Sequence, residues 1–335
     1  MVTEATSAAH GVRIATSNLS LADRWDHFLA RWAVNRSGHR VEPGLYALGT
    51  PTADSPVFVT ANYSLSFDAL RQALRGLDGY ILVLDTKGIN VWCAAGKGTF
   101  GTGELARQIG ATNLDGIVNH RVLTLPQLGA PGVAAHDVKK RSGFKVEYGP
   151  VRAEDLPQYL KAGRATTEMR RVTFNLRERL VLIPVELVHA LLPTFFAALV
   201  LFLLAGRLAA LGATVSVLAG VVIFPILLPW LPTTDFSSKG FVLGAVAALP
   251  FALAALYNAV DLSPAMRAGW AATYLLAMPP VTAYLALNFT GSTPITSKSG
   301  VKREMKAYVP VMATLFALGA LAIVVLLSAP RLGVA

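Results

Sequence analysis

The sequence of 335 residues contains a single cysteine, Cys93, and comparatively few charged residues. One cysteine cannot form a disulfide within the chain, and it cannot supply the cysteine clusters that structural zinc sites and iron–sulfur centres need. Charged residues make up 15% of the sequence and hydrophobic residues 53%. This balance is poor for a wholly soluble protein and indicates a membrane protein.

The charges are unevenly distributed along the chain. Residues 1–180 hold 22 of the 30 Lys and Arg and 16 of the 20 Asp and Glu, a net charge of +6 (22 − 16), which leaves +4 (8 − 4) for the rest. An excess of basic residues can indicate nucleic-acid binding, but much of this excess lies just before the first long apolar run. That placement favours a positive-inside anchor at anionic lipid, with no nucleic-acid partner. The first twenty residues lack a signal-peptide core, so we expect the soluble part to stay in the cytoplasm.

The second half contains five apolar runs of about 20 residues or more, each long enough to cross a bilayer. The predicted spans lie near residues 181–205, 208–231, 241–260, 268–289 and 307–328. Basic residues precede the first run and fill the loop after the fourth, which places both on the cytoplasmic side of the inner membrane. Glu186 and His189 lie three residues apart in the first run, either as a functional intramembrane pair or as an interfacial one.

Strands alternate with helices between residues 41 and 165. The predicted strands cover residues 57–63, 79–86, 121–126 and 144–149, and the predicted helices cover residues 66–76, 104–111, 132–143 and 153–164. This alternation predicts an α/β fold with a doubly wound, Rossmann-like parallel sheet, in which ligands bind beyond the carboxyl ends of the strands. A short amphipathic helix over residues 21–32 precedes it.

We therefore predict four parts of the chain. They are an N-terminal extension (1–40), a cytoplasmic ligand-binding domain (41–165), a basic linker (166–180) and an all-α transmembrane domain of five helices (181–335).

The segment NVWCAAGK, residues 90–97, is the most informative in the chain. Asn90 is a favourable helix N-cap and Gly96 a plausible stop, so Cys93 falls in the first turn. The small side chains of Ala94 and Ala95 would let a broad, flat ligand approach this helix closely. A soft thiolate beneath a flat macrocycle is a suitable ligand for a transition metal. A lone cysteine in apolar surroundings is more often an inert core residue, and the residues alone leave both interpretations open.

The run from Gly96 to Gly101 also satisfies the dinucleotide-binding pattern G-x-G-x-x-G. The match is weak because these glycines follow the cysteine-bearing turn instead of leaving a strand directly. A phosphate-binding P-loop is excluded because Gly98 follows Lys97 where Ser or Thr is required.

At these residues the chain resembles a known family. INVWCAAGKGTFGTGEL (89–105) closely resembles the cap-helix motif of the mercury-methylating corrinoid proteins, the membrane members of the two-protein mercury methylation system. VFVTANYSLSFDAL (57–70) and GYILVLDTKG (79–88) resemble this family and its soluble relative, the large subunit of the corrinoid iron–sulfur protein. The resemblance covers about residues 40–165. The apolar runs and the loop NFTGSTPITSKSGVKREM (288–305) distinguish the chain from the soluble relative, whose cysteine-ligated cluster a single cysteine cannot supply.

The resemblance implies a base-off, cobalamin-type corrinoid with Cys93 as the lower axial ligand of its cobalt. The cap helix beneath the corrin would consist of Asn90, Val91, Trp92, Cys93, Ala94, Ala95, Gly96 and Lys97. Topology alone adds further candidates for cofactor contacts in the neighbouring loops, namely Thr60, Thr124, Gly129 and Gly132. Ordinary strand-to-helix turns explain these four positions equally well.

The resemblance further implies a corrinoid-dependent methyltransferase that moves a methyl group from methyl-Co(III) to inorganic Hg(II), giving methylmercury. The implied partners are a ferredoxin-like protein with two [4Fe–4S] clusters as reductant and a methyl donor linked to methyltetrahydrofolate. The basic residues Lys139, Lys140, Arg141 and Lys145 could receive an acidic ferredoxin, although a solvated helix end is the favoured interpretation. Two alternatives remain: a membrane-tethered corrinoid methyl carrier of anaerobic one-carbon metabolism, or a nucleotide-binding domain on a small membrane sensor or transporter.

Overall fold

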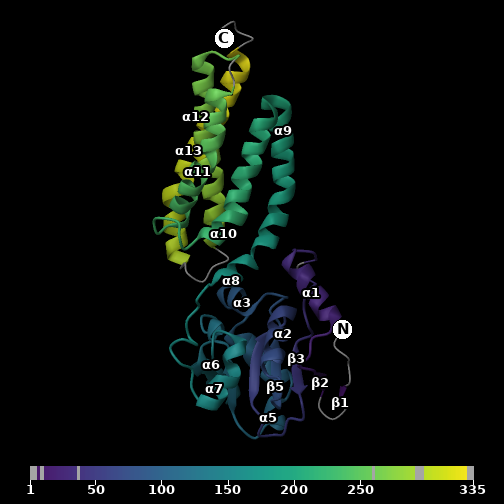
Figure 1. Ribbon diagram of the computed structural model, residues 1–335. Coiled ribbons are helices and arrows are strands. Elements are labelled where there is room, and N and C mark those ends of the chain that lie inside the picture. Colours follow the sequence, from purple (N-terminus) through teal and green to yellow (C-terminus); the bar gives the residue numbers. More distant parts are fainter. Residues whose placement is uncertain (1–5, 8–10, 36–37, 259–260, 291–297, 330–335) are drawn as a thin grey trace. The chain divides into compact units, whose positions relative to one another are not determined.

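A computed structural model describes residues 6–7, 11–35, 38–258, 261–290 and 298–329 (Figure 1). The chain forms two compact units, residues 1–172 and 173–335, and each is considered by itself. Part of the predicted loop over 288–305 (residues 291–297) and the last two residues of the predicted span 241–260 lie outside the described residues.

The first unit is built on a seven-stranded sheet with the strand order β1-β2-β3-β5-β4-β6-β7. The strands are β1 (Thr6–Ser7), β2 (Val12–Ala15), β3 (Gly44–Leu48), β4 (Val57–Ala61), β5 (Gly79–Leu84), β6 (Val122–Leu125) and β7 (Lys145–Tyr148). The four predicted strands are confirmed as β4 to β7, and they are mutually parallel. The sheet is mostly parallel, as predicted, but it is mixed, because β3 runs antiparallel to β5 and β1 antiparallel to β2.

Helices cover both faces of this sheet. They are α1 (Leu21–Arg31), α2 (Ser64–Ala73), α3 (Val91–Lys97), α4 (Thr102–Ala111), α5 (Leu114–Ile117), α6 (Ala135–Ser142) and α7 (Leu156–Ala162), with short 3-10 turns η1 (Gln127–Gly129) and η2 (Ala153–Asp155). The predicted helices are confirmed as α1, α2, α4, α6 and α7. Both β2 and α1, which fall in the predicted N-terminal extension, belong to this unit.

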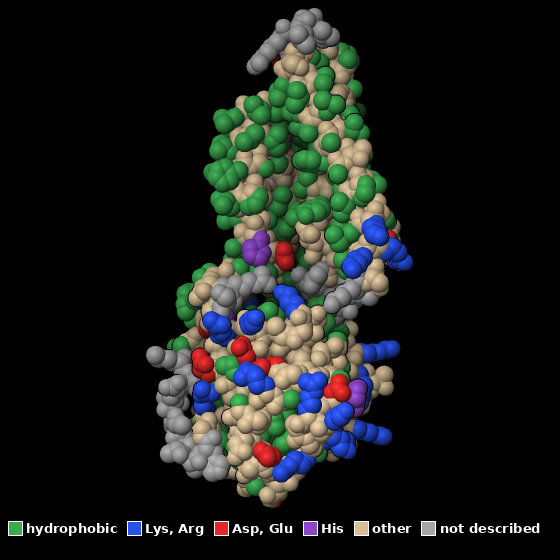
Figure 2. All heavy atoms as spheres, turned by 180° about the vertical axis from the view of Figure 1, so that it is seen from behind, with side chains coloured by type: hydrophobic (Ala, Val, Ile, Leu, Met, Phe, Trp, Pro, Cys, Tyr) green, Lys and Arg blue, Asp and Glu red, His purple; other side chains and the backbone are tan. Residues whose placement is uncertain are grey.

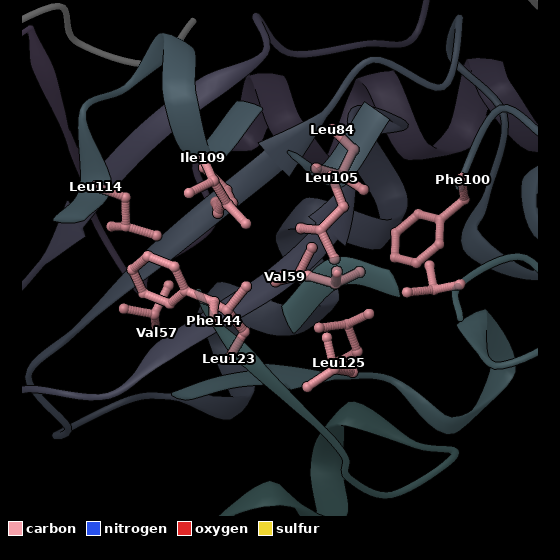
Figure 3. Packing of buried hydrophobic residues seen from close by; sticks show 14 of the residues in the cluster. Val57, Val59, Leu84, Phe100, Leu105, Ile109, Leu114, Leu123, Leu125 and Phe144 are labelled. Carbon is pink, nitrogen blue, oxygen red and sulfur yellow. The ribbon is translucent and has the colours of Figure 1, made fainter. Parts of the chain in front are cut away.

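The strand side chains alternate between two hydrophobic clusters. Val59 and Leu84 face the cluster under α4 and α6, where they meet Phe100 and Leu105 (Figure 3). Their neighbours along the strands face the other cluster, under α2 and α7. Because both faces are covered, the central strands are continuous apolar runs. Each buried side chain of this size contributes roughly 1.5–3 kcal/mol to folding.

The second unit is helical. Its elements are α8 (Leu176–Leu180), α9 (Ile183–Leu218), a π-helical turn (Ala219–Ile223), α10 (Phe224–Leu227), α11 (Phe236–Tyr257), α12 (Pro264–Phe289) and α13 (Lys298–Ser328). Four helical segments of the described chain are long and apolar enough to cross a membrane: Leu176–Leu227, Phe236–Tyr257, Pro264–Phe289 and Ser299–Ser328. Figure 2 shows hydrophobic side chains over most of one face of this unit, with charged groups near one end.

Four such segments appear instead of the five predicted spans because the first two runs form one segment of 52 residues. A straight helix of that length would measure about 78 Å, against a hydrocarbon core of about 30 Å. The chain instead reverses direction within α9 (Figure 1), where Gly206 has φ 83° and ψ −177°. Glu186 and Gly220, which are 34 positions apart (220 − 186), consequently line one cleft. The runs 181–205 and 208–231 are thus two arms of a hairpin.

Small residues let α11 and α12 approach each other closely. A Cβ on Gly240 would lie 2.6 Å from the Ala283 Cα, and one on Gly244 would lie 2.7 Å from the Pro279 Cα. Residues of this size at four-residue spacing are the usual contact surface between membrane helices, which gain no hydrophobic free energy from associating in lipid.

We predict that Gly206→Ala destabilises the helical unit by about 1–3 kcal/mol, because its backbone angles fall in a region that only glycine occupies readily. A Cβ at Gly206 would meet no atom within 4 Å, so the cost would come from the backbone alone. Thermal unfolding of the full chain in detergent measures it. Gly110→Ala, in α4 and equally free of contacts, is the control and should not destabilise. An unchanged midpoint for Gly206→Ala would contradict the hairpin.

Candidate functional site

The loop between β5 and α3 is organised by Asn62, which follows β4 and is 2% exposed. Its side-chain oxygen accepts hydrogen bonds from the backbone N–H groups of Thr86 and Gly88, both at 3.0 Å. The Thr86 hydroxyl lies 2.9 Å from the same oxygen and 2.6 Å from the Ile89 carbonyl oxygen. Asn62 therefore fixes the path of the chain just before the cysteine-bearing helix.

Helix α3 begins and ends with specific caps. The Asn90 side chain accepts a hydrogen bond of 2.9 Å from the Cys93 backbone N–H, which confirms the predicted N-cap. The helix does not stop at Gly96 but continues to Lys97, and Gly98 closes it in the left-handed conformation with φ 84°. Cys93 consequently lies in the first turn, and its thiol is free and partly exposed.

The two faces of α3 have different surroundings. Val91, Ala94 and Ala95 are buried in the core cluster, with Ala94 0% exposed. The expectation that both alanines would open a flank to a flat ligand is therefore wrong, because their small size serves packing against the sheet. The outward face instead carries Cys93 and Gly96 (i, i+3) and, further along, Lys97, while Trp92 is half-buried. Gly96 leaves space beside the thiol, because a Cβ there would meet nothing within 4 Å.

Two glycines predicted to contact the cofactor pack against the core side of α3 and the turn after it. A Cβ on Gly132 would collide with the Phe100 carbonyl oxygen and lie 2.9 Å from the Ala95 Cα, and one on Gly129 would lie 2.6 Å from the Phe100 ring. These two glycines thus permit close packing of the loop after β6 under α3 and the turn that follows it. Burial raises the pKa of Tyr148, whose hydroxyl stays protonated and donates to the Val133 carbonyl oxygen of this loop at 2.5 Å.

The two predicted threonines lie within strands. Thr60 is buried within β4, where it pairs with Val83, and Thr124 lies within β6. Asn62 and Thr86, which sequence reasoning missed, are the residues that act on the loop. The available signal was a polar residue directly after a buried apolar strand, at the end of the sheet where ligands bind.

Helix α3 lies at the point where the chain connections diverge. After β4 the chain passes to α2 on one face, and after β6 it passes to α6 on the other. Because α3 contacts both β4 and η1, it bridges the carboxyl ends of these neighbouring strands. Such a switch point is where doubly wound sheets bind their ligands.

The donor set around Cys93 limits the kind of metal it could hold. Among the described residues, no group of three or more His, Cys, Asp or Glu side chains could hold a metal ion. A metal carried in a macrocycle needs only one axial ligand from the protein, and a soft thiolate suits a transition metal. The partly exposed thiol and the clear space at Gly96 fit a flat macrocyclic metal complex.

Comparison with known proteins connects this unit to corrinoid proteins. Residues 32–160 match the family model of the CO dehydrogenase/acetyl-CoA synthase delta subunit. The acetyl-CoA decarbonylase/synthase complex subunit gamma of Methanopyrus kandleri is 36% identical over 129 residues, which is 38% of this chain and 27% of the relative. The corrinoid/iron-sulfur protein large subunit of Moorella thermoacetica is 29% identical over 129 residues, 38% of this chain and 28% of the relative. The α/β unit is homologous to these subunits.

The similarity covers only part of this chain and only part of each relative. The chain spans about a quarter of the length of these curated relatives. The family match begins at residue 32, after α1, and ends at residue 160, before α8. It includes Asn62, the whole of α3 and the loop after β6, so the homologous region is the one that positions Cys93.

We predict that Asn62→Ala releases the loop before α3. The backbone N–H groups of Thr86 and Gly88 would lose their acceptor, whereas the Thr86 hydroxyl could still donate to the Ile89 carbonyl oxygen. Each unsatisfied buried donor costs about 1–3 kcal/mol. Hydrogen exchange of the peptide covering residues 85–97 measures the effect, and the amides of Thr86 and Gly88 should exchange faster. Asn119→Ala, which removes an exposed bond of 3.0 Å to Asp54, is the matched control. Unchanged exchange in Asn62→Ala would show that the loop is held by other contacts.

Proposed function

We propose that this protein is a membrane-bound, corrinoid-dependent methyltransferase in which Cys93 is the lower ligand of cobalt and inorganic Hg(II) is the methyl acceptor. The observation that carries the proposal is the position of the chain's one cysteine, on the outward face of α3 beyond the carboxyl ends of β4 and β6. The homologous relative from Moorella thermoacetica is named a corrinoid/iron-sulfur protein, which supports a corrinoid as the cofactor.

Each of several residues in and before α3 would have a separate role in binding the corrinoid. When bound, the corrinoid would supply the methyl-transfer chemistry. The Cys93 thiolate would donate from below, while the Asn90 cap keeps the first turn of α3 in place. Gly96 would allow the macrocycle to lie close to the helix, and Lys97 would remain at its edge.

The choice of Hg(II) rests on the resemblance of the segment from residue 89 to 105 to the mercury-methylating family and on the chemistry of a thiolate ligand. Mercury(II) is an electrophile, so it accepts a methyl group together with bonding electrons. A thiolate is a strong electron donor to a metal, and Cys93 would therefore favour release of the methyl group together with its bonding electrons. The helices of the second unit, which no soluble carrier needs, agree with the membrane-bound family.

The proposal includes partners and a location. With one cysteine, the chain would take electrons from a separate ferredoxin-like protein with two [4Fe–4S] clusters, and its methyl group from a donor linked to methyltetrahydrofolate. The helical unit would lie in the cytoplasmic membrane with the α/β unit on the cytoplasmic side. A second candidate, a membrane-tethered methyl carrier of one-carbon metabolism, is favoured by the names of the relatives, which are subunits of an acetyl-CoA decarbonylase/synthase complex.

We predict that Cys93→Ala abolishes methylmercury formation when the chain is expressed anaerobically with its ferredoxin-like partner. Cys93→Ser, which keeps the size and polarity but removes the soft donor, should lose most of the activity too. Methylmercury is measured directly, and the visible spectrum of the bound corrinoid should change in both variants. Full activity in Cys93→Ala would contradict the thiolate ligand. A wild type that binds corrinoid but forms no methylmercury would favour the methyl-carrier function.

We predict that Gly96→Ala lowers the corrinoid content of the purified protein without destabilising it. Alanine inside a helix is favoured over glycine by about 1 kcal/mol, so folding should not suffer. The added methyl group would lie beside Cys93, where the macrocycle approaches. Gly103→Ala, in α4, where an added Cβ would likewise meet no atom within 4 Å, is the control. Equal corrinoid content in both variants would mean that the ligand does not lie against the outward face of α3.

A further inference from the structure

Helix α1 is attached to the α/β unit through its polar side. Asp23 accepts a hydrogen bond of 2.8 Å from the Arg71 guanidinium, and Asp26 lies 2.7 Å from the ring of His39. A third link joins His27 to Asp68 at 2.7 Å. Burial alone would raise the pKa of Asp23, but hydrogen bonds from the Ser20 backbone and Arg71 outweigh it and hold the pKa below its usual value. The carboxylate therefore stays ionised near neutral pH.

The apolar side of α1 faces away from the unit. Leu21 is 85% exposed, Trp25 61%, Phe28 47% and, just after the helix, Trp32 36%. Their spacing of four, three and four residues places them on one face. The rings also form a continuous row, with centroid separations of 5.2 Å between Trp25 and Phe28 and 5.9 Å between Phe28 and Trp32.

This arrangement reverses the usual order, in which an amphipathic helix buries its apolar stripe and exposes its polar one. Within α1 only Ala30 is buried. Exposed apolar patches of this kind mark surfaces that are covered in the working protein. The polar contacts of Asp23, Asp26 and His27 would keep the aromatic row facing outward, so the row is a defined part of the unit's surface.

The charges beside the row indicate what covers it. Arg24 is exposed and Arg31 is half-buried, and among the described residues neither is paired with a carboxylate, whereas both acidic residues of α1 are bonded to the unit. The outward side thus combines Trp, Phe and Leu with Arg. Amphipathic helices of this composition lie in the interface of anionic membranes, where tryptophan prefers the headgroup level.

We propose that α1 lies in the interface of an anionic lipid bilayer, with its aromatic row at the boundary between headgroups and acyl chains. The inference rests on the membrane insertion of the helical unit and is independent of mercury or corrinoid chemistry. Because that unit would tether α1 beside the bilayer, a weak interfacial interaction is sufficient. The family match starts at residue 32, so α1 lies outside the part of the chain that matches the family model.

The test uses the full chain in nanodiscs of phosphatidylcholine and phosphatidylglycerol. In a Cys93→Ala background, a polarity-sensitive nitrobenzoxadiazole dye is attached at Phe28→Cys, and in a second variant at Lys140→Cys on α6, which is exposed. We expect blue-shifted emission from position 28, quenched by shallow doxyl-labelled lipid and protected from aqueous iodide. Position 140 should show the opposite. Arg24→Gln or removal of phosphatidylglycerol should reduce the lipid quenching at position 28.

Two results would overturn the inference. Emission typical of water at both positions would mean that α1 stays in solvent. Blue-shifted emission at position 28 without lipid quenching would mean that protein covers the aromatic row, either the helical unit or a second copy. Methylmercury formation is assayed separately on the wild type, so failure of the proposed function and failure of this inference remain distinguishable.

Discussion

The position of Cys93 depends on one buried amide. Asn62 stands at the end of β4 with its side chain shielded from water, and its oxygen accepts hydrogen bonds from the chain between β5 and α3. A buried polar group without partners is costly, so the loop has little freedom once the sheet has formed. The loop in turn delivers Asn90 to the start of α3, and Asn90 caps the turn that carries the thiol.

Close packing explains why the buried positions Ala94 and Ala95 of α3 carry small side chains. The inner face of α3 must fit between the sheet and the loop after β6, where Gly132 approaches the backbone at Ala95. Its outer face then presents a free thiol with open space beside it. Packing thus uses one side of this seven-residue helix, and we propose that the opposite side faces the corrin.

Local pattern was sufficient for the central strands and for the N-cap of α3, whereas the end of α3 lies at Lys97, beyond the predicted stop at Gly96. The apolar runs of β4 and β5 and the turns between elements identify the parallel part of the sheet, and Asn90 identifies the start of α3. Strand β3 could not be predicted because its five residues follow Pro43 in a turn-rich stretch and become a strand only by pairing with β5. The inward orientation of Ala94 and the polar attachment of α1 likewise depend on tertiary contacts that no periodicity contains.

In the helical unit, hydropathy located the apolar runs, but the backbone break at Gly206 decides how the first two are joined.

X-ray absorption at the cobalt edge of the corrinoid-loaded protein tests the proposed cobalt ligand most directly. We expect one sulfur scatterer in the wild type that is absent in Cys93→Ser. A coordination shell of nitrogen and oxygen alone in the wild type would contradict the proposed thiolate ligand.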